Sequence, residues 1–432
     1  MLFCNIMILN SDFIIQKDMY VTVKDDTIEY IGNKRPEGDH GREYDGRGKL
    51  LMPGFVNAHA HSPMTLMRGY GENMALQQWL NDRIFPFEAK LDGNAVYWGT
   101  MLAMAESVGN GIVSTTDMYY FTDDMVRAVL ESGAKNNISR SITNFGDEDI
   151  FHMAAGREMK KAFEDHHMAG NGRVRIDMSL HAEYTTTPKT VDQLAEYTKS
   201  IGAHQHVHVS ETKTEHEECK QRHGMTPVEY LAAHGLFDVP TTAAHCVWIE
   251  GDDYDILKEK GVTAAVNPIS NMKLASGVCN VQALIDRGIN VAIGTDSVSS
   301  NNSLDFLEEM KVFAIAGKEH YNNPIAVTPT ETLRAATLGG ALSQGRTDCG
   351  MIKEGYKADL TVLDVSGPNM HPVHEMINNV VYSANAGNVS MTMADGRVLY
   401  ENGEYKTIDI EKTIYNVEKA TGQILARLTE EK

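Results

Sequence analysis

Apolar segments of strand length alternate with amphipathic stretches through the middle of this chain, and this alternation constrains the fold more than any other feature. Several of the intervening stretches end in a glycine that can cap a helix. Eight strand-then-helix units predict a (β/α)8 TIM barrel of the α/β class, and a doubly wound open sheet is the competing architecture. The predicted strands span residues 51–61, 111–119, 138–145, 174–182, 204–210, 241–247, 262–268 and 290–297.

The two ends of the chain have a different pattern, in which short strands are separated by turn residues. Residues 19–32 place β-branched and aromatic residues on both sides of an Asp-Asp turn, which predicts a hairpin. Residues 358–365 and 389–405 have the same pattern of short β-branched and apolar stretches, and Asp395-Gly396 is a hairpin turn signal. A last amphipathic stretch predicts a helix on the outside of the molecule near the C-terminus.

We therefore expect two structural units, one of which is assembled from both chain ends. The predicted barrel covers residues 54–348, while residues 1–53 and 349–432 are expected to form a small β-sandwich domain together with the terminal helix. A length of 432 residues fits this division, because α/β barrels exceed the usual ~100–200 residues of one domain.

The composition disfavours several classes of partner. The 39 basic and 59 acidic residues give a net charge of −20, whereas nucleic acids and anionic membranes need clustered Lys and Arg. No uncharged apolar run approaches the ~20 residues that span a bilayer, and the apolar start of the chain lacks the basic residues of a signal peptide. The five scattered cysteines contain no C-x-x-C pair. We expect a cytoplasmic protein that acts on a small molecule, and a homo-oligomer is compatible with the sequence.

Residues that bind metals or move protons lie at the ends of several predicted strands. His59 and His61 are two residues apart, so both rings point to the same side of a strand. The carboxyl ends of barrel strands converge on one mouth, which would bring such residues together. The other candidates are His204, His206 and His208, followed by Glu211, and then His245 and Asp296.

Each of these residues also has an ordinary structural interpretation. A single histidine such as His245 is more often a hydrogen-bonded core residue than a ligand, and Asp296 alone could cap a helix. Compatible ligands at three separate strand ends are much harder to explain in this way. The pattern therefore predicts a metal site at the mouth of the barrel.

Five motifs, taken in order, resemble the amidohydrolase superfamily: VNAHAH, HVHVSE, AAHCVW, NPISNMKL and GTDSVSSNNSLD. The resemblance covers nearly the whole chain. It implies that His59, His61, His208 and Asp296 bind one divalent ion, Zn²⁺ or alternatively Fe²⁺. Relatives with two metal ions bridge them with a Lys at the end of strand four, and no Lys stands within the corresponding strand VRIDMSLHA, which favours a single ion.

The resemblance also implies roles in hydrolytic deamination. A divalent metal lowers the pKa of bound water from 15.7 towards ~7, and Asp296 can accept a proton from that water while His245 orients or stabilises the hydroxide. Glu211, three residues after His208, is implied as the shuttle that protonates a ring nitrogen of the substrate and then the departing amine. Strict alternation would place Glu211 on the face opposite His208, so we expect the strand to end near Val209.

Within the superfamily the chain is most similar to the 5′-methylthioadenosine/S-adenosylhomocysteine deaminases. The stretch WLNDRIFPFEAKL resembles their strand-one loop, which implies that Glu88 binds the ribose hydroxyls and that Trp79 packs against the adenosine or its 5′ substituent. The stretch LHAEYTTTP implies that His181 contacts the substrate, although Glu183 stands where these proteins more often have Pro.

Two arginines bind the amino-acid carboxylate of S-adenosylhomocysteine in that family, which implies Arg140 and Arg157 here. A guanidinium suits bidentate recognition of a carboxylate. Arg140 is expected at the end of a strand, facing the mouth. Arg157 fits a solvated helix position beside Glu158 almost equally well.

The expected reaction is therefore metal-dependent hydrolytic deamination of 5′-methylthioadenosine, S-adenosylhomocysteine or adenosine to the inosine analogue and ammonia. Guanine, cytosine, pterin and s-triazine hydrolases share the same metal core, so an amidohydrolase that acts on a free base or an s-triazine is the alternative. A catalytically inactive interaction protein is a further alternative, but such proteins usually lose ligands that are all present here.

Overall fold

The strands of this chain form two β-sheets in the computed structural model, which describes residues 1–74 and 76–430. One sheet has eight strands that pair in parallel and follow one another in sequence order. A parallel bridge between Ala60 and Asp296 joins the first strand to the segment after the last. The strands are β6 (Phe55–Ala60), β7 (Ile112–Met118), β8 (Lys135–Ile142), β9 (Val174–Leu180), β10 (Gln205–Val209), β11 (Thr241–His245), β12 (Thr263–Val266) and β13 (Val291–Ile293).

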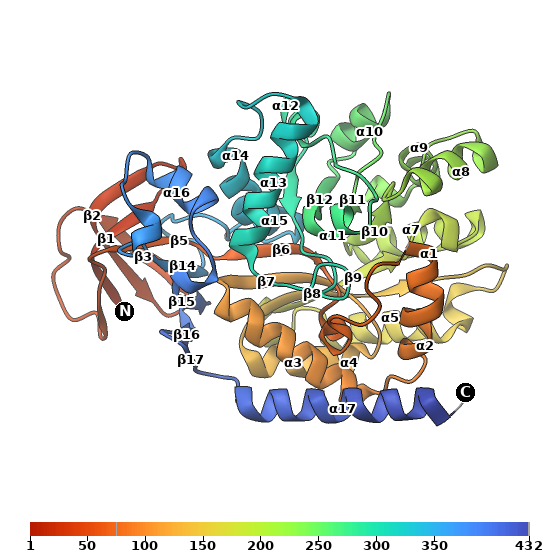
Figure 1. The fold of residues 1–432 in the computed structure, drawn as a ribbon, viewed down its shortest axis with the longest axis horizontal. Coiled ribbons are helices and arrows are strands. Elements are labelled where there is room, and N and C mark those ends of the chain that lie inside the picture. The colour runs from red at the N-terminus through yellow and green to blue at the C-terminus, as the bar shows by residue number, and fades with distance from the viewer. Residues whose placement is uncertain (75, 431–432) are drawn as a thin grey trace.

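This ring confirms the predicted barrel, and its sequential strand order excludes the doubly wound sheet, in which the order reverses. Every residue of β6 and β7 is buried, as is typical of parallel strands covered on both faces. Helices follow the strands and surround them (Figure 1). They are α1 (Leu76–Trp79), α2 (Phe85–Glu88), α3 (Gly93–Gly109), α4 (Thr122–Ser132), α5 (Ala154–His166), α6 (Ala169–Gly172), α7 (Pro188–Ile201), α8 (Lys213–His223), α9 (Pro227–Ala233), α10 (Asp253–Glu259), α11 (Pro268–Lys273), α12 (Val281–Asp286), α13 (Phe306–Tyr321), α14 (Pro329–Arg334) and α15 (Gly340–Ser343).

The second sheet contains strands from both chain ends and lies beside the barrel, at the left of Figure 1. Its nine strands run in the order β17-β16-β15-β14-β5-β1-β2-β3, with β4 paired to β1. The hairpin predicted over residues 19–32 is β2 and β3, and Asp395-Gly396 turns the chain between β15 and β16. The strands are β1 (Leu2–Leu9), β2 (Ile15–Lys24), β3 (Thr27–Gly32), β4 (Glu43–Asp45), β5 (Lys49–Pro53), β14 (Leu360–Asp364), β15 (Val389–Ala394), β16 (Arg397–Glu401) and β17 (Glu404–Tyr405), and helix α16 (Met376–Tyr382) lies between β14 and β15.

The segment 51–61, predicted as one strand, belongs to two, which corrects the prediction. Its first part is β5, which pairs with β1 and β14 in the second sheet, and its second part is β6 in the barrel. Gly54 separates them, and a Cβ added there would lie 2.3 Å from Cγ1 of Val113. Only glycine allows the chain to pass so close to β7 as it moves from one sheet to the other.

The predicted terminal helix is α17 (Ile410–Glu430), which runs back under the barrel and packs against α3 (Figure 1). Its buried residues recur at helical spacing on one face, as expected for an amphipathic surface helix. They are Thr413, Val417, Ala420 and Ile424. Neither α17 nor any other helix of residues 1–74 and 76–430 is long and apolar enough to cross a membrane.

Candidate active site

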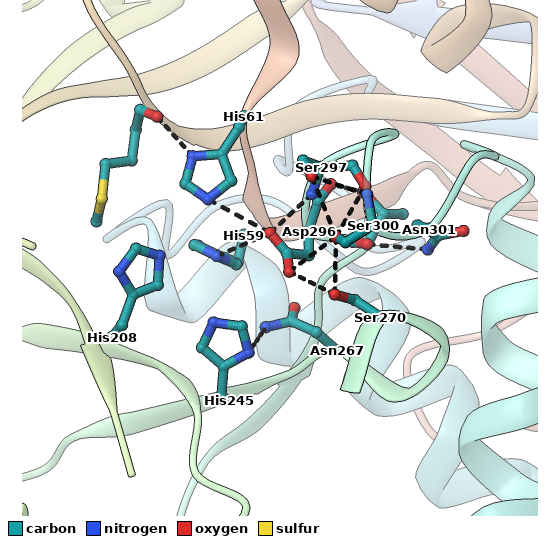
Figure 2. A network of polar contacts seen from close by, with 12 residues as sticks. His59, His61, His208, His245, Asn267, Ser270, Asp296, Ser297, Ser300 and Asn301 are labelled. Atoms are coloured by element: carbon teal, nitrogen blue, oxygen red, sulfur yellow. Dashed lines mark hydrogen bonds and ion pairs between the residues drawn. The ribbon is translucent and has the colours of Figure 1, made fainter. Parts of the chain in front are cut away.

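Four histidines and one aspartate meet at the carboxyl ends of the barrel strands (Figure 2). His59 lies in β6 and His61 follows it, while His208 and His245 lie in the neighbouring strands β10 and β11. The ring of His59 lies with its centroid 4.9 Å from that of His208 and 5.2 Å from that of His245. Asp296 follows β13 and closes the ring of residues. The structure therefore brings together the residues that the motifs singled out.

The ligand atoms of these residues form two overlapping groups that could hold a metal ion. His59, His61 and Asp296 form one group, and His59, His208 and His245 form the other, with the atoms of each group within 4.8 Å of one another. Nε2 of His61 lies 3.3 Å and Nε2 of His59 lies 3.6 Å from Oδ1 of Asp296. His59 belongs to both groups, so all five side chains surround one centre.

The hydrogen bonds of two histidines leave a lone pair directed at that centre. Nδ1 of His61 donates to the carbonyl of Met118 at 2.6 Å, and Nδ1 of His208 donates to the carbonyl of His181 at 2.8 Å. A carbonyl only accepts, so Nδ1 carries a proton in both rings and Nε2 is the nitrogen that can bind a cation. Although burial opposes it, Asp296 raises the pKa of His61 to about 9, so a metal ion that binds its Nε2 displaces a proton.

His59 shows the clearest need for a ligand. Its Nδ1 lies 2.9 Å from Nε2 of His206, whereas its own Nε2 is buried without a hydrogen-bond partner among the described residues. Buried polar atoms almost always have a partner, and burial lowers the pKa of His59 to about 3, so this ring is neutral. A lone pair on a neutral buried nitrogen fits a metal ion.

Asp296 is fixed through both of its carboxylate oxygens. Oδ2 accepts the hydroxyl of Ser270 at 2.5 Å and that of Ser300 at 3.2 Å, and Oδ1 accepts the backbone N–H of Ser297 at 2.7 Å. Burial alone would raise the pKa of Asp296, but the adjacent rings of His59 and His61 hold this pKa well below its usual range. Its carboxylate is therefore a charged, oriented group facing the histidines.

His245 has different surroundings from the other three histidines. Its Nδ1 faces the side-chain amide of Asn267 at 3.1 Å (Figure 2) and that of Asn271 at 2.9 Å. An amide can offer either an N–H or a C=O group, so it does not fix the proton on one ring nitrogen. Nε2 of His245 lies 3.8 Å from Oε2 of Glu211. Burial lowers the pKa of His245, so the neutral ring is favoured while the two amides orient it.

The turn after β10 directs Glu211 into the same site. The strand ends at Val209, as expected, and Ser210 has a φ of 50°, in the left-handed region. Glu215 holds this turn by accepting the backbone N–H groups of Ser210 at 3.0 Å and Glu211 at 2.7 Å. Glu211 is thus turned over the mouth instead of pointing to the opposite face of the strand.

The environment of Glu211 favours the protonated carboxyl group. Burial, followed by the charge of Asp296, raises the pKa of Glu211 to about 8, and the hydroxyl of Ser276 lies 3.4 Å from Oε1. Near neutral pH this side chain can donate a proton, as a general acid requires.

A cavity with about 100 Å³ of space for water-sized molecules opens above these residues. Its wall includes the apolar side chains of Trp79, Leu80, Ile84 and Phe85, which come from α1, α2 and the π-helical turn η2 (Leu80–Ile84) between them. The other lining residues are His61, Met64, Glu88, Met118, Tyr119, Tyr120, Ser141, His181, Tyr184, His208, Glu211, His245, Leu274, Asp296, Ser297 and Ser300.

Three of the predicted substrate-binding residues therefore line the cavity, namely Trp79, Glu88 and His181. Oε2 of Glu88 accepts the hydroxyl of Tyr120 at 3.2 Å, and burial raises the pKa of this carboxyl group. The carbonyl of His181 also orients His208, which links the substrate wall to the metal-binding group.

The two predicted arginines do not line the cavity. The guanidinium of Arg140 lies over the ring of Tyr120, 4.5 Å from its centroid, and its Nε donates to Oε2 of Glu158 at 2.8 Å. Arg157 lies in α5, where its guanidinium donates to the carbonyl of His152 and is exposed. The structure thus places Arg140 behind the cavity wall and Arg157 outside it.

Sequence reasoning missed several residues that shape the site. His206 supports His59, although the H-x-H-x-H run placed it only as one candidate among three. Glu215 stands three residues after Thr212, the spacing of a helix capping motif, and this signal could have indicated its position. Tyr119 and Tyr120 carry no motif, because their position in the wall depends on which loops meet above the barrel.

Comparison with known proteins agrees with this geometry. The Amidohydrolase family model matches residues 50–399, and the chain belongs to this family. A curated 5-methylthioadenosine/S-adenosylhomocysteine deaminase from Thermoanaerobacter pseudethanolicus is 38% identical over 94% of each chain. A 5′-deoxyadenosine deaminase from Methanothermobacter thermautotrophicus is 37% identical, again over 94% of each chain. The solved structure of an adenosine deaminase from Xanthomonas campestris with bound zinc has a TM-score of 0.91 and 27% identity, covering 98% of this chain and 99% of its own.

Proposed function

We propose that this amidohydrolase deaminates adenosine-type nucleosides by hydrolysis, releasing ammonia and leaving the inosine analogue. The observation that carries this proposal is the placement of Glu211, a buried carboxyl group with a raised pKa, beside a group of metal-binding side chains in a cavity. The names of the relatives support the same substrate class, because they include deaminases of methylthioadenosine, S-adenosylhomocysteine and 5′-deoxyadenosine.

We propose that one divalent metal ion, zinc with iron as the alternative, binds to His59, His61, His208 and Asp296. Three neutral imidazole nitrogens and a carboxylate are a donor set that zinc commonly takes. The partnerless Nε2 of His59 and the carbonyl-bound Nδ1 atoms of His61 and His208 support this assignment. When bound, such an ion supplies hydroxide at neutral pH because it lowers the pKa of water from 15.7 to about 7.

The residues around this centre divide the proton transfers between them. Asp296 accepts a proton from the attacking water, and His245 holds that water in place through Nε2. Glu211 protonates the ring nitrogen beside the carbon under attack, which makes that carbon more electrophilic. Glu211, deprotonated by this step, takes up the proton held by Asp296 and delivers it to the amino group, which leaves as ammonia when the C–N bond breaks. The proton of the newly added hydroxyl group returns to Glu211 as the C=O bond forms. The sum is one water added and one ammonia released.

The cavity wall supplies the contacts that distinguish a nucleoside from a free base. Glu88 accepts the ribose hydroxyls in this proposal, since two hydroxyl donors match the two oxygens of one carboxylate. Trp79 packs against the sugar or the 5′ substituent, and His181 contacts the substrate from the opposite wall. All three side chains line one cavity above the metal-binding group.

A panel of nucleosides and free bases tests this function. The protein is loaded with zinc or iron and mixed with adenosine, 5′-methylthioadenosine, 5′-deoxyadenosine, S-adenosylhomocysteine, guanine, cytosine and an s-triazine. We expect ammonia release and the ultraviolet change from adenine to hypoxanthine with the adenosine derivatives. Turnover of a free base or triazine alone would overturn the proposed substrate class, and a protein that binds no metal would overturn the enzyme assignment.

A further inference from the structure

The cavity wall of this protein offers no Lys or Arg side chain to a substrate. Among its described lining residues, the carboxyl groups are those of Glu88, Glu211 and Asp296, and none of the lining residues is Lys or Arg. A substrate with an anionic tail therefore finds no cation on the wall itself. A cation that pairs with such a tail has to come from the residues packed behind the wall.

Arg140 is the cation that lies directly behind this wall. Its guanidinium covers the ring of Tyr120, and the neighbouring Ser141 also lines the cavity. Two of its nitrogens are already engaged, because Nε donates to Oε2 of Glu158 at 2.8 Å and Nη1 donates to the carbonyl of Ser141 at 2.6 Å. These two bonds hold one side of the guanidinium group against the protein.

Glu158 is itself held in this position. Its other oxygen accepts the backbone N–H of Thr122 at 2.9 Å, at the start of α4. The side chains of Arg140 and Glu158 are 16% and 30% exposed, so solvent screens the pair less than it screens a surface ion pair. A carboxylate arriving at Arg140 would meet a cation whose charge is already balanced by a fixed carboxylate.

The adjoining groove offers no better cation. It is lined by Lys273 and Glu72, beside Trp79 and Leu274 of the main cavity. Nζ of Lys273 lies 2.8 Å from Oε2 of Glu72, so this charge is also balanced. Arg140 behind the wall and Lys273 in the groove are therefore each paired with a glutamate.

The wall formed by the 79–85 segment suits an uncharged substituent. Leu80, Ile84 and Phe85 line the cavity together with Trp79 and the sulfur-containing Met118. A methylthio or methyl group would bury apolar surface there without losing hydration, whereas a carboxylate would lose its hydration without a free partner.

We propose that Glu158 determines specificity at the 5′ end of the substrate by occupying Arg140, so that this enzyme prefers adenosines with an uncharged 5′ substituent to those with a carboxylate tail. The inference rests on the proposed deamination of adenosine-type nucleosides and narrows its substrate class. Glu158 acts here through Arg140 and through its own charge, without contact with the reacting atoms.

The test compares kcat/KM for three substrates in the wild-type protein and in Glu158→Gln. The substrates are 5′-methylthioadenosine, S-adenosylhomocysteine and the methyl ester of S-adenosylhomocysteine, which keeps the bulk of the tail but lacks the carboxylate. We expect the wild type to use both 5′-methylthioadenosine and the ester at least about tenfold better than S-adenosylhomocysteine, as the loss of one charged hydrogen bond predicts.

In Glu158→Gln the side chain can still accept the Thr122 N–H, but Arg140 is released for the substrate. We expect kcat/KM for S-adenosylhomocysteine to rise about tenfold, while the values for 5′-methylthioadenosine and the ester stay within about twofold. The double variant Arg140→Gln with Glu158→Gln should not show this rise in kcat/KM for S-adenosylhomocysteine. Glu164→Gln removes the same charge from the exposed face of α5 and should change none of the ratios.

The outcomes separate this inference from the proposed function. Equal use of S-adenosylhomocysteine and its ester by the wild type would overturn the inference without any variant, and deamination itself would stand. An unchanged ratio in Glu158→Gln, with normal turnover of 5′-methylthioadenosine, would overturn it as well. If the metal-loaded wild type deaminated no nucleoside at all, the proposed function would fail and this inference would fail with it.

Discussion

The floor and the rim of the cavity are held in place in different ways. The floor, formed by His59, His61, His208, His245 and Asp296, is fixed largely by bonds to the backbone and to small polar side chains. The rim, formed by residues 79–88 with Tyr120, Arg140 and Glu158, depends more on contacts between long side chains, although Arg140 and Glu158 each also bond to one backbone group.

This difference suits the floor to the chemical step and the rim to substrate specificity. Backbone-held groups at strand ends cannot move without disturbing the barrel, so the floor suits a reaction that needs fixed distances. Side-chain pairs can be exchanged by single substitutions that leave the barrel intact. We therefore expect large effects on catalysis from the floor and smaller, substrate-dependent effects from the rim.

Loss of a metal ligand should have the largest effect. Asp296→Ala removes the carboxylate that faces His59 and His61, so we expect bound metal to fall below stoichiometry and deamination to fall to background. Metal analysis and ammonia release on the same preparation check this. A variant that deaminates normally with no bound metal would contradict the assignment of the floor.

Glu211→Gln should separate chemistry from metal binding. Because the amide cannot deliver a proton, we expect kcat to fall by about 10²–10⁴-fold while the metal content stays at the wild-type level. Full activity in this variant would remove Glu211 from proton transfer.

The pH dependence of kcat/KM should reflect the ionisation of Glu211. Burial raises the pKa of Glu211 to about 8, and the proposed mechanism uses its protonated form. We therefore expect kcat/KM to fall above about pH 8, by about tenfold for each further pH unit. A profile that stays flat to pH 10 would show that no proton with this pKa is required.

On the rim, Glu88→Gln should lower kcat/KM for nucleosides and leave metal binding unchanged. Exchange of a carboxylate for an amide weakens hydrogen bonds to two hydroxyls, each worth about 1.5–3 kcal/mol when charged, so we expect a 10- to 100-fold loss in kcat/KM for nucleosides, about 1.4–2.8 kcal/mol. An equal loss for a 2′,3′-dideoxy analogue, which has no such hydroxyls, would exclude the ribose contact.

The smallest effect should be that of a rim substitution on the free energy of unfolding. The Arg140–Glu158 pair is partly exposed, so we expect Glu158→Gln to lower the free energy of unfolding by about 0–1 kcal/mol. Urea unfolding checks this value. A loss of about 3 kcal/mol, as for a broken buried ion pair, would mean that Glu158 mainly stabilises the fold.

The floor could be predicted from the sequence because its signals are local. The two-residue spacing of His59 and His61 and the strand-end position of Asp296 follow from strand geometry once the barrel is assumed. The predicted end of β10 at Val209 was also correct, since only a turn there brings Glu211 over the mouth.

The rim could not be predicted in the same way. The pairing of Arg140 with Glu158 depends on how α5 packs against β8, and no spacing along the chain encodes that contact. The same limit explains the predicted strand 51–61, whose division at Gly54 follows from the approach of the chain to Val113 in the neighbouring strand.

Ammonia release from 5′-methylthioadenosine, measured side by side for metal-loaded and metal-stripped wild-type protein, tests the central claim most directly. The floor described above predicts stoichiometric ammonia and inosine analogue from the loaded protein, none from the stripped protein, and recovery when zinc or iron is returned. Equal turnover with and without metal, or no turnover of any adenosine derivative by the loaded protein, would contradict it.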